Sequence, residues 1–465
     1  MVAQIALVLW ILVSIGMFAV LHPLRAFLLT FVIGYLVLPV EVGDGITFTG
    51  TIYISQSLRI DKLTACNIGA IIGTCLFASQ VLTRYRFHWV DAVYGAVLGG
   101  AFLTSLANGL GAKDGVSHAV ETLRQIFPLI VLSRLYITGP AELYEAVHAV
   151  IAGAFLYSFL CVAEFRLSPQ AHRMVYGYFQ HGFEQFERYN HFRPAGFLRH
   201  AIELAFFMGT STALAAWLWF KGLLRPLWGT VPPWAVVTAL AVGTATTLTF
   251  SGYAACLASA GVLAMLAITR SRWMLAVLPA LAVAWMVGRY TNTVDGTFLM
   301  NSVDKVDVLR MESLQYRLEA ERLHLEVAAE HLWLGKGAMF GVLRKEDGSA
   351  VKAVDSWWMI TLVFYGVVGL GGWLLVWGAG IVDTMRYWGW LTEDAKALTA
   401  GVSVIAGAQF IDFLFNAFPS PFLMMLGMGL VAALQRYPKS VAVMQPLFED
   451  VEEGLLRPDI EGAVS

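Results

Sequence analysis

Charged residues are scarce in this sequence, since only 14% of its 465 residues are charged while 58% are hydrophobic. Soluble domains carry about 25% charged residues. A chain this apolar needs lipid as its solvent, with its backbone hydrogen bonds closed inside helices. The net charge of −2 shows no positive excess that would favour nucleic acid as a partner.

Cysteine patterns and nucleotide-binding motifs are also lacking. The four cysteines have neither metal-ligand spacing nor a disulfide pattern. The sequence contains no GxxxxGK[ST] motif and no GxGxxG motif after a predicted strand. We therefore expect a reaction that uses no ATP, no metal and no other cofactor.

Long apolar runs are abundant instead. Thirteen runs have roughly the 17–25 residues with which a helix crosses a bilayer. They lie at 2–20, 24–41, 62–82, 89–108, 122–138, 142–163, 199–220, 233–250, 252–269, 273–289, 356–381, 397–415 and 420–435. The sequence therefore predicts an all-α, polytopic membrane protein with about 12–14 transmembrane helices. No repetitive or Ser/Gly-rich stretch divides it, so residues 1–465 form one membrane domain.

The Lys and Arg residues of the short loops indicate the orientation. Twelve of them fall on one face, at Arg25, Arg84, Arg86, Arg134, Lys221, Arg225, Arg270, Arg272, Arg386, Lys396, Arg436 and Lys439, and four on the other, at Arg59, Lys62, Lys113 and Arg124. The first face and the tail 436–465 are therefore predicted to be cytoplasmic. Two long polar stretches, 164–198 and 290–355, then lie on the outer, periplasmic face, where we expect the functional site.

The end of the first outer stretch, NHFRPAGFLRH, is basic and leads directly into an apolar run. Pro194 and Gly196 predict a tight turn after Arg193, which places Arg199 and His200 in the first turn of the next helix. Cations there oppose the helix dipole, and a bound phosphate would compensate for them. The alternative is that these side chains anchor the helix by snorkelling to the membrane surface.

The second outer stretch predicts a helix over residues 306–337, ended by glycines. Four basic residues spaced by seven would form one stripe on it, because seven steps of ~100° return to nearly the same face. They are Arg310, Arg317, His324 and His331. Glu321 lies one turn beyond Arg317, close enough to pair with it or to act chemically. The alternative is an amphipathic helix on the bilayer with ion pairs on its wet face.

Asp355 lies where the chain returns to the membrane, directly before Ser356, Trp357 and Trp358. A carboxylate at this position is suited to proton transfer with a substrate. A simple helix cap is the alternative.

These features follow one another in an order that resembles a known family. The order is Arg193, Gly196 and His200, then TFSGYAACLASAGVLAML, then an outer helix with Arg317, His331, Gly335 and Gly337, and then DSWWMITLVFYGVVGLGG. It resembles the O-antigen ligase and Wzy-type polymerase superfamily of bacterial envelope glycosyltransferases over residues 190–375. The rest of the chain resembles that superfamily in hydropathy alone.

The sequence departs from the family pattern at three places. Leu332 replaces the proline that follows the loop histidine, and Gly252 stands where the family commonly has arginine. Asp355 replaces the histidine expected where the chain returns to the membrane. This last departure favours a polymerase or a divergent relative over a typical lipopolysaccharide ligase.

The resemblance implies a donor glycan on undecaprenyl pyrophosphate and transfer to a hydroxyl of an acceptor glycan or lipid. Arginines would stabilise the leaving pyrophosphate, and a carboxylate or imidazole would deprotonate the acceptor. On this reading the pyrophosphate is bound by Arg193 and Arg317, supported by Arg289, Arg310 and His200. The candidate bases are Glu321, Asp355 and His324, in that order.

Localisation in the bacterial cytoplasmic membrane follows from the same resemblance, with membrane lipids and other polysaccharide-assembly proteins as further partners. Two other classes of function remain open. A flippase for lipid-linked sugars would place its charges inside the membrane as well and would be expected to contain internal repeats. A non-catalytic subunit of a polysaccharide export complex would tolerate the loss of Arg317.

Overall fold

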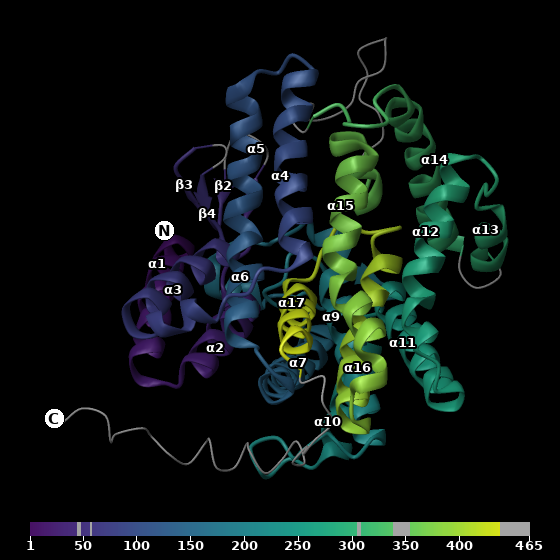
Figure 1. Ribbon diagram of the computed structural model, residues 1–465. Coiled ribbons are helices and arrows are strands. Elements are labelled where there is room, and N and C mark those ends of the chain that lie inside the picture. The colour runs from purple at the N-terminus through teal and green to yellow at the C-terminus, as the bar shows by residue number, and fades with distance from the viewer. Residues whose placement is uncertain (44–47, 56–57, 305–307, 338–353, 438–465) are drawn as a thin grey trace.

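The computed structural model describes residues 1–43, 48–55, 58–304, 308–337 and 354–437, and these form an all-α protein with a few two-residue strands (Figure 1). The helices are α1 (Val2–Val20), α2 (Pro23–Val37), α3 (Lys62–Phe77), α4 (Trp89–Ala107), α5 (Ala112–Gln125), α6 (Phe127–Tyr136), α7 (Pro140–Leu167), α8 (Ala171–Tyr176), α9 (Ala201–Phe220), α10 (Pro233–Thr246), α11 (Phe250–Thr269), α12 (Val277–Tyr290), α13 (Thr297–Asp304), α14 (Val308–Glu330), α15 (Trp357–Tyr387), α16 (Glu393–Asp412) and α17 (Pro421–Gln435). The strands pair antiparallel, β1 (Val42–Gly43) with β2 (Phe48–Thr49), β3 (Ile52–Tyr53) with β4 (Arg59–Ile60), and β5 (Glu187–Arg188) with β6 (His191–Phe192).

The expected all-α, multi-pass membrane architecture is confirmed. Within the described residues, 7 helices are long and apolar enough to cross a membrane. They are α1, α4, α7, α9, α11, the combined segment Arg272–Tyr290, and α15. Four shorter apolar helices, α2, α3, α10 and α17, pack among them.

Prolines and one aspartate define several helix starts. Pro23, Pro233 and Pro421 occupy the first turn of α2, α10 and α17, where the missing N–H costs no hydrogen bond. Asp61 caps α3, because its side chain accepts a hydrogen bond of 2.8 Å from the backbone N–H of Thr64. These residues fix where the chain enters each helix.

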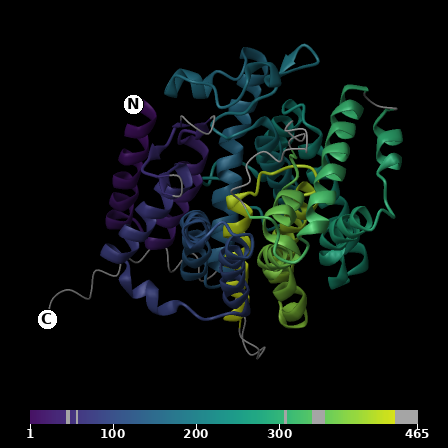
Figure 2. The ribbon, with the colours of Figure 1, turned by 90° about the horizontal axis from the view of Figure 1, so that it is seen from above.

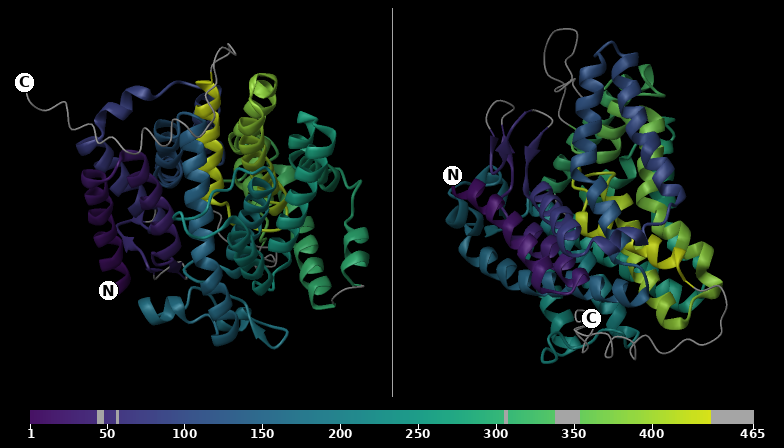
Figure 3. Two further views of the ribbon diagram at one scale, coloured as in Figure 1. Left: turned by 90° about the horizontal axis from the view of Figure 1, so that it is seen from below. Right: turned by 60° about the vertical axis from the view of Figure 1, so that its left-hand side comes forward.

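The helices are arranged around a buried centre. Figures 2 and 3 show α1 and α3 at one side of the molecule and α12 to α14 at the opposite side, with α17 and α16 between them. Helix α9 is also central, since most of its residues are buried inside the protein. The outermost helices leave apolar side chains exposed, for example Leu9 and Leu76, as expected of surfaces that face lipid.

Two glycines bring α9 and α11 into close contact. A Cβ atom on Gly209 would lie 2.1 Å from the carbonyl oxygen of Gly252, and one on Gly252 would lie 2.5 Å from that of Ala205. Small residues permit this approach of backbones in membrane helices. The contact holds the start of α11, and with it Thr249, against the start of α9.

The connecting segments gather on two faces, as the sequence predicted. On one face Lys62 donates to the carbonyl of Phe197 at 3.0 Å. On the other, Trp217 donates to the carbonyl of Ala397 at 2.7 Å, and Arg436 donates to the carbonyl of Arg84. We call the first face, which carries the described parts of both long polar stretches, the outer face, after the side on which the sequence predicts them.

The predicted span over 122–138 consists of two helices. Helix α5 ends beside the outer face, where Arg124 pairs with Asp61 at 2.9 Å. Pro128 occupies the first turn of α6, and Arg134 near its end pairs with a carboxylate of α4 on the opposite face. The chain therefore crosses the protein here with a break, because proline begins a helix more readily than it continues one.

The predicted span over 356–381 turns back on itself at Gly366. This glycine has φ 63° and ψ −169°, outside the helical region. The rings of Trp357 and Trp373 lie 6.4 Å apart, although sixteen residues of straight helix would separate them by roughly 24 Å. Helix α15 is therefore a short arm before Gly366 and a long arm after it.

The predicted outer helix is confirmed as α14, which ends at Glu330. Gly335 and Gly337 follow it with φ of 71° and 88°. Their role is packing, since a Cβ on Gly335 would lie 2.5 Å from the backbone of Phe364 and the backbone N–H of Lys336 donates to the carbonyl of Val363 at 2.7 Å. The glycines thus dock the end of α14 onto the reversal of α15.

Candidate functional site

The turn before α9 is built on a buried carboxylate. The backbone N–H groups of Ala195 and Gly196 donate to Glu164 of α7 at 3.0 and 2.8 Å. Gly196 has φ 56°, and a Cβ there would lie 2.7 Å from the ring of Tyr157. The tight turn predicted at Pro194 and Gly196 is confirmed, and it fixes the direction of Arg193.

Arg193 is 4% exposed. Its Nε and Nη2 atoms donate to the hydroxyl of Thr249 at 3.2 and 3.0 Å, and its Nη1 atom donates to the carbonyl of Gln185 at 3.2 Å. Thr249 belongs to the TFSG segment before α11. Two motifs that are separate in the sequence therefore meet at one guanidinium group.

His200 caps α9, because its Nδ1 atom accepts a hydrogen bond of 3.0 Å from the N–H of Ile202. Its Nε2 atom lies 3.2 Å from the side-chain oxygen of Gln185. Burial, and then the charge of Arg193, lower the pKa of His200 to about 3, and the charge of Arg317 acts in the same direction. The imidazole is therefore neutral near pH 7.

The start of α9 does not need the predicted bound anion to balance the charges of Arg199 and His200 against the helix dipole. His200 is uncharged and acts as an acceptor at the helix start. Arg199 pairs with Glu203 in the first turn of α9 at 3.3 Å, and its backbone N–H donates to the same carboxylate at 2.9 Å. Glu203 thus supplies the negative charge that the helix N-terminus favours.

Arg317 of α14 faces Asp355, with 3.7 Å between its Nε atom and the nearer carboxylate oxygen. The two side chains are 27% and 55% exposed, so this pair is open to solvent. The positive charge of Arg317 is near enough to act on His200. Arg193, His200, Arg317 and Asp355, taken from both outer stretches, therefore lie in one region, which we call the arginine site.

Glu321 belongs to a different environment. It pairs with Arg289 of α12, and the two side chains are 3% and 8% exposed. Burial raises the pKa of Glu321, although Arg289 opposes the shift. The other guanidinium nitrogens of Arg289 donate to the carbonyls of Val294 and Leu318 at 3.0 and 3.3 Å. Arg289 and Glu321 thus hold α12 and α14 together.

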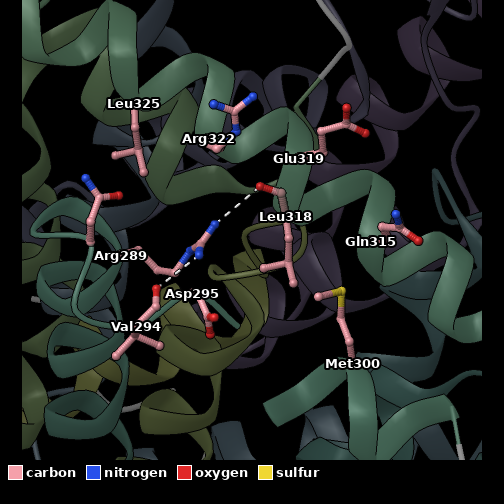
Figure 4. A pocket seen from close by; sticks show the side chains of 10 residues that line it. Arg289, Val294, Asp295, Met300, Gln315, Leu318, Glu319, Arg322 and Leu325 are labelled. Atoms are coloured by element: carbon pink, nitrogen blue, oxygen red, sulfur yellow. Dashed lines mark hydrogen bonds between the residues drawn. The ribbon is translucent and has the colours of Figure 1, made fainter. Parts of the chain in front are cut away.

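Arg289 also lines a cavity of about 400 Å³ between α12, α13 and α14. Figure 4 shows its guanidinium turned toward the backbone oxygens of Val294 and Leu318, with Met300 and Arg322 farther along the cavity wall. The residues of this wall include neither Arg193 nor Arg317. The supporting role predicted for Arg289 at a pyrophosphate is therefore replaced by a structural one.

The four residues of the predicted basic stripe do not share one environment in the described structure. His324 is 7% exposed and its Nδ1 atom lies 2.8 Å from the carbonyl oxygen of Ala320, one turn back in α14. His331 lies just beyond the end of α14, where its carbonyl accepts from Gly335 at 2.8 Å. The side chain of Arg310 lies outside the described residues. Among the four, Arg317 is the one that the described structure brings to the arginine site.

The loop between α16 and α17 completes the arginine site and was missed by the sequence analysis. The ring of Phe418 stacks on His200 at 5.5 Å. The carbonyl of Asn416 accepts from the N–H of Trp357 at 3.1 Å, and the charge of Asp412 interacts with that of Arg317. The available signal was an aspartate and an asparagine inside an otherwise apolar run, which is costly unless such residues are used.

Among the residues that the structure describes, no group of three or more His, Cys, Asp or Glu side chains lies close enough to hold a metal ion. The arrangement instead offers guanidinium groups, a neutral imidazole and an exposed carboxylate. No known family model matches the chain, and no curated protein matches it.

Proposed function

We propose that this protein transfers a glycan from an undecaprenyl-pyrophosphate carrier to an acceptor hydroxyl, as a polymerase or ligase of O-antigen or exopolysaccharide assembly. The reaction would take place on the outer face of the bacterial cytoplasmic membrane. The proposal is supported chiefly by the meeting of two outer stretches: Arg317 faces Asp355 across 3.7 Å with 27% of its side chain exposed, and its charge and that of Arg193 both lower the pKa of His200.

Electrostatics support a phosphate ligand at this position. The imidazole of His200 is neutral near pH 7, so the positive charge of this region comes from Arg193 and Arg317. Guanidinium groups match phosphate oxygens in shape and can bind them through two hydrogen bonds. A pyrophosphate that leaves with growing negative charge would gain more from these arginines than the bound donor does, which is the condition for catalysis.

Asp355 fits the role of general base better than Glu321. Its side chain is 55% exposed beside Arg317, whereas the carboxylate of Glu321 is buried against Arg289. In the proposed step the acceptor oxygen bonds to the anomeric carbon as its proton passes to Asp355. The bond from that carbon to the phosphate oxygen breaks, and undecaprenyl pyrophosphate departs with the electron pair, bound by Arg317 and by Arg193, whose donors would exchange Thr249 and Gln185 for phosphate oxygens.

The test is glycan output in a deletion strain of the native host, complemented with wild type, Arg193→Ala, Arg317→Ala or Arg322→Ala. Arg322 is the matched control, because it lies on α14 with a 62% exposed side chain paired to Glu326. Loss of Arg317 is expected to lower long-glycan output at least ~100-fold, the usual cost of removing a group that stabilises transition-state charge. Arg322→Ala should keep wild-type output, with membrane levels checked by blot.

The intermediates that accumulate distinguish the alternatives. A single-repeat glycan on an otherwise intact acceptor indicates a polymerase, and unattached long chains indicate a ligase. Lipid-linked oligosaccharide that stays on the cytoplasmic face would indicate a flippase instead. Normal long glycan in Arg193→Ala and Arg317→Ala would refute the catalytic proposal in favour of a non-catalytic subunit.

A further inference from the structure

A second cavity, of about 360 Å³, opens on the outer face between α2, α3, the end of α5, the start of α6 and the start of α17. This volume falls in the range of roughly 300–1,000 Å³ that is typical of small-molecule sites. We call it the α2–α3 cavity. It has no lining residue in common with the cavity beside Arg289.

One aromatic ring separates the α2–α3 cavity from the arginine site. The guanidinium of Arg199, which lines the cavity, lies 5.4 Å from the centre of the Phe418 ring. The same ring stacks on His200 at 5.5 Å with an interplanar angle of 12°. Pro419, the next residue, lines the cavity as well. A ligand in the cavity would therefore be separated from His200 by the ring of Phe418.

The charged groups at the mouth of the α2–α3 cavity already have partners. Arg59 pairs with Glu41 at 3.1 Å and with Glu121 at 2.7 Å. Asp61 pairs with Arg124 at 2.9 Å. Because each cation has an anion beside it, this part of the wall presents hydrogen-bonding groups with little uncompensated charge.

The cations deeper in the cavity are also engaged by neighbouring groups. Lys62 donates to the carbonyls of Tyr35 and Phe197 at 3.2 and 3.0 Å, and its ammonium lies 4.0 Å from the centre of the Tyr35 ring. Arg199 is neutralised by Glu203, which also accepts a hydrogen bond from the hydroxyl of Tyr35. An anion bound here would have to compete with these contacts for its cations.

The balanced wall suits a neutral polyhydroxylated ligand. Carboxylate oxygens of Glu41 and Asp61 can accept hydrogen bonds from sugar hydroxyls, and Gln125 can both donate and accept. The rings of Phe48 and Trp377 add apolar surface that can cover the C–H face of a sugar ring. A cavity that is partly apolar and carries a few placed polar groups is typical of a specific small-ligand site.

We propose that the α2–α3 cavity binds a neutral sugar unit of the acceptor glycan, so that its reacting hydroxyl lies toward Phe418 and the arginine site. This inference rests on the proposed function, because only that function makes the bound sugar an acceptor. Binding of a saccharide can itself be measured without any transfer. The arginine site would hold the donor pyrophosphate, and Phe418 would separate the two substrates.

The test uses the purified full-length protein in lipid nanodiscs and saturation-transfer-difference NMR. The probe is the host's own repeat-unit oligosaccharide, released from its lipid carrier by mild acid. Leu63→Trp places a large side chain at the cavity wall. Leu76→Trp is the matched control, because Leu76 lies on the same helix with 64% exposure and is not a lining residue of the cavity.

Wild type and Leu76→Trp are expected to transfer saturation to the sugar-ring protons, and Leu63→Trp should lose at least ~90% of that signal because the site is filled. Arg317→Ala should keep the signal even if it abolishes glycan output, which separates failure of this inference from failure of the proposed function. A signal retained in Leu63→Trp would overturn the inference, as would the absence of any signal in wild type. Displacement of the sugar by millimolar inorganic phosphate would identify an anion site instead.

Discussion

Two ion pairs lie one turn apart on α14 and differ in almost every physical respect. Glu321 and Arg289 form a pair with side chains that are 3% and 8% exposed. Arg317 and Asp355 face each other across 3.7 Å with side chains that are 27% and 55% exposed. In the sequence, Arg317 and Glu321 are equally good candidates for chemistry. In the fold, the first is accessible and the second is committed to a helix contact.

Burial and partnership therefore decide what each of these charged residues can do. A carboxylate enclosed with a guanidinium cannot accept a proton from an incoming hydroxyl without breaking that pair, whereas a solvent-exposed carboxylate can. Breaking a buried pair leaves an uncompensated charge and is strongly destabilising. Exposed pairs contribute about 0–1 kcal/mol to stability. The two pairs should therefore respond oppositely to substitution, one in stability and the other in activity.

The largest effect is expected for Glu321→Gln. It leaves the buried charge of Arg289 without its anion, which should lower the free energy of unfolding by about 3–5 kcal/mol. The measurement is the Tm of the purified protein in detergent together with its level in the membrane. Glu326→Gln is the control, because this carboxylate is 64% exposed on the same helix and its loss should change Tm little.

A double variant sharpens this test. Arg289→Met combined with Glu321→Leu removes both charges, and it should recover most of the stability that Glu321→Gln loses, because well-packed apolar residues often replace buried ion pairs without cost. Recovery of glycan output in the same variant would confirm that neither residue takes part in the reaction. If Glu321→Gln were stable but inactive, Glu321 would be the base after all.

The sequence was sufficient for the features that depend on local composition. Apolar runs predicted the membrane helices, Pro194 and Gly196 predicted the turn, and helix formers predicted α14. Features that depend on long-range packing could not be read from it. The partner of Glu321 lies 32 positions away at Arg289, and the reversal at Gly366 is set by contacts with Trp333 and Gly335. Spacing on one helix says nothing about which neighbouring helix will bury a residue.

In the candidate site too, residue type could be predicted from the sequence and long-range packing could not. Arg193 and Arg317 were identified by residue type and membrane placement, and both lie close enough to His200 for their charges to act on it. The loop with Asn416 and Phe418 was missed, because its residues become part of the site only when α16 and α17 pack beside α9 and α15. Polar residues within an apolar run were the available indication.

In the exposed pair of Arg317 and Asp355, Asp355→Asn should lower the rate of glycan transfer by about 10²–10⁴-fold, because a positioned general base contributes that much. The Tm should stay near that of wild type. The assay is transfer from lipid-linked donor to acceptor in membrane vesicles. Asp295→Asn provides the control from the same outer stretch, since Asp295 accepts hydrogen bonds from Thr297 within its own loop. Equal rates for wild type and Asp355→Asn would remove Asp355 from the mechanism.

The smallest effect concerns His200, where the two outer stretches meet. Its pKa is about 3 in the folded protein and 6.5 when unperturbed, so between these values the unfolded chain binds a proton that the folded protein does not. The contribution of His200 to the free energy of unfolding is therefore present above pH 6.5. It falls as the pH drops, by about 2 kcal/mol between pH 7 and pH 5. His200→Asn keeps a capping side chain at the start of α9 but cannot titrate, so it should flatten the fall of Tm over this interval.

The comparison needs two reference proteins, because other buried histidines titrate too. The pKa of His172 is lowered to about 4 by burial, so part of the slope should persist in His200→Asn. His172→Asn should remove that part of the slope and keep the part that belongs to His200. If His200→Asn and wild type lost Tm equally from pH 7 to pH 5, the pKa of His200 would be the same in the folded and the unfolded protein, and the ring would be charged at pH 5 in both. It would then be a third positive charge beside Arg193 and Arg317 at pH 5, and a bound anion would be needed there to balance the start of α9.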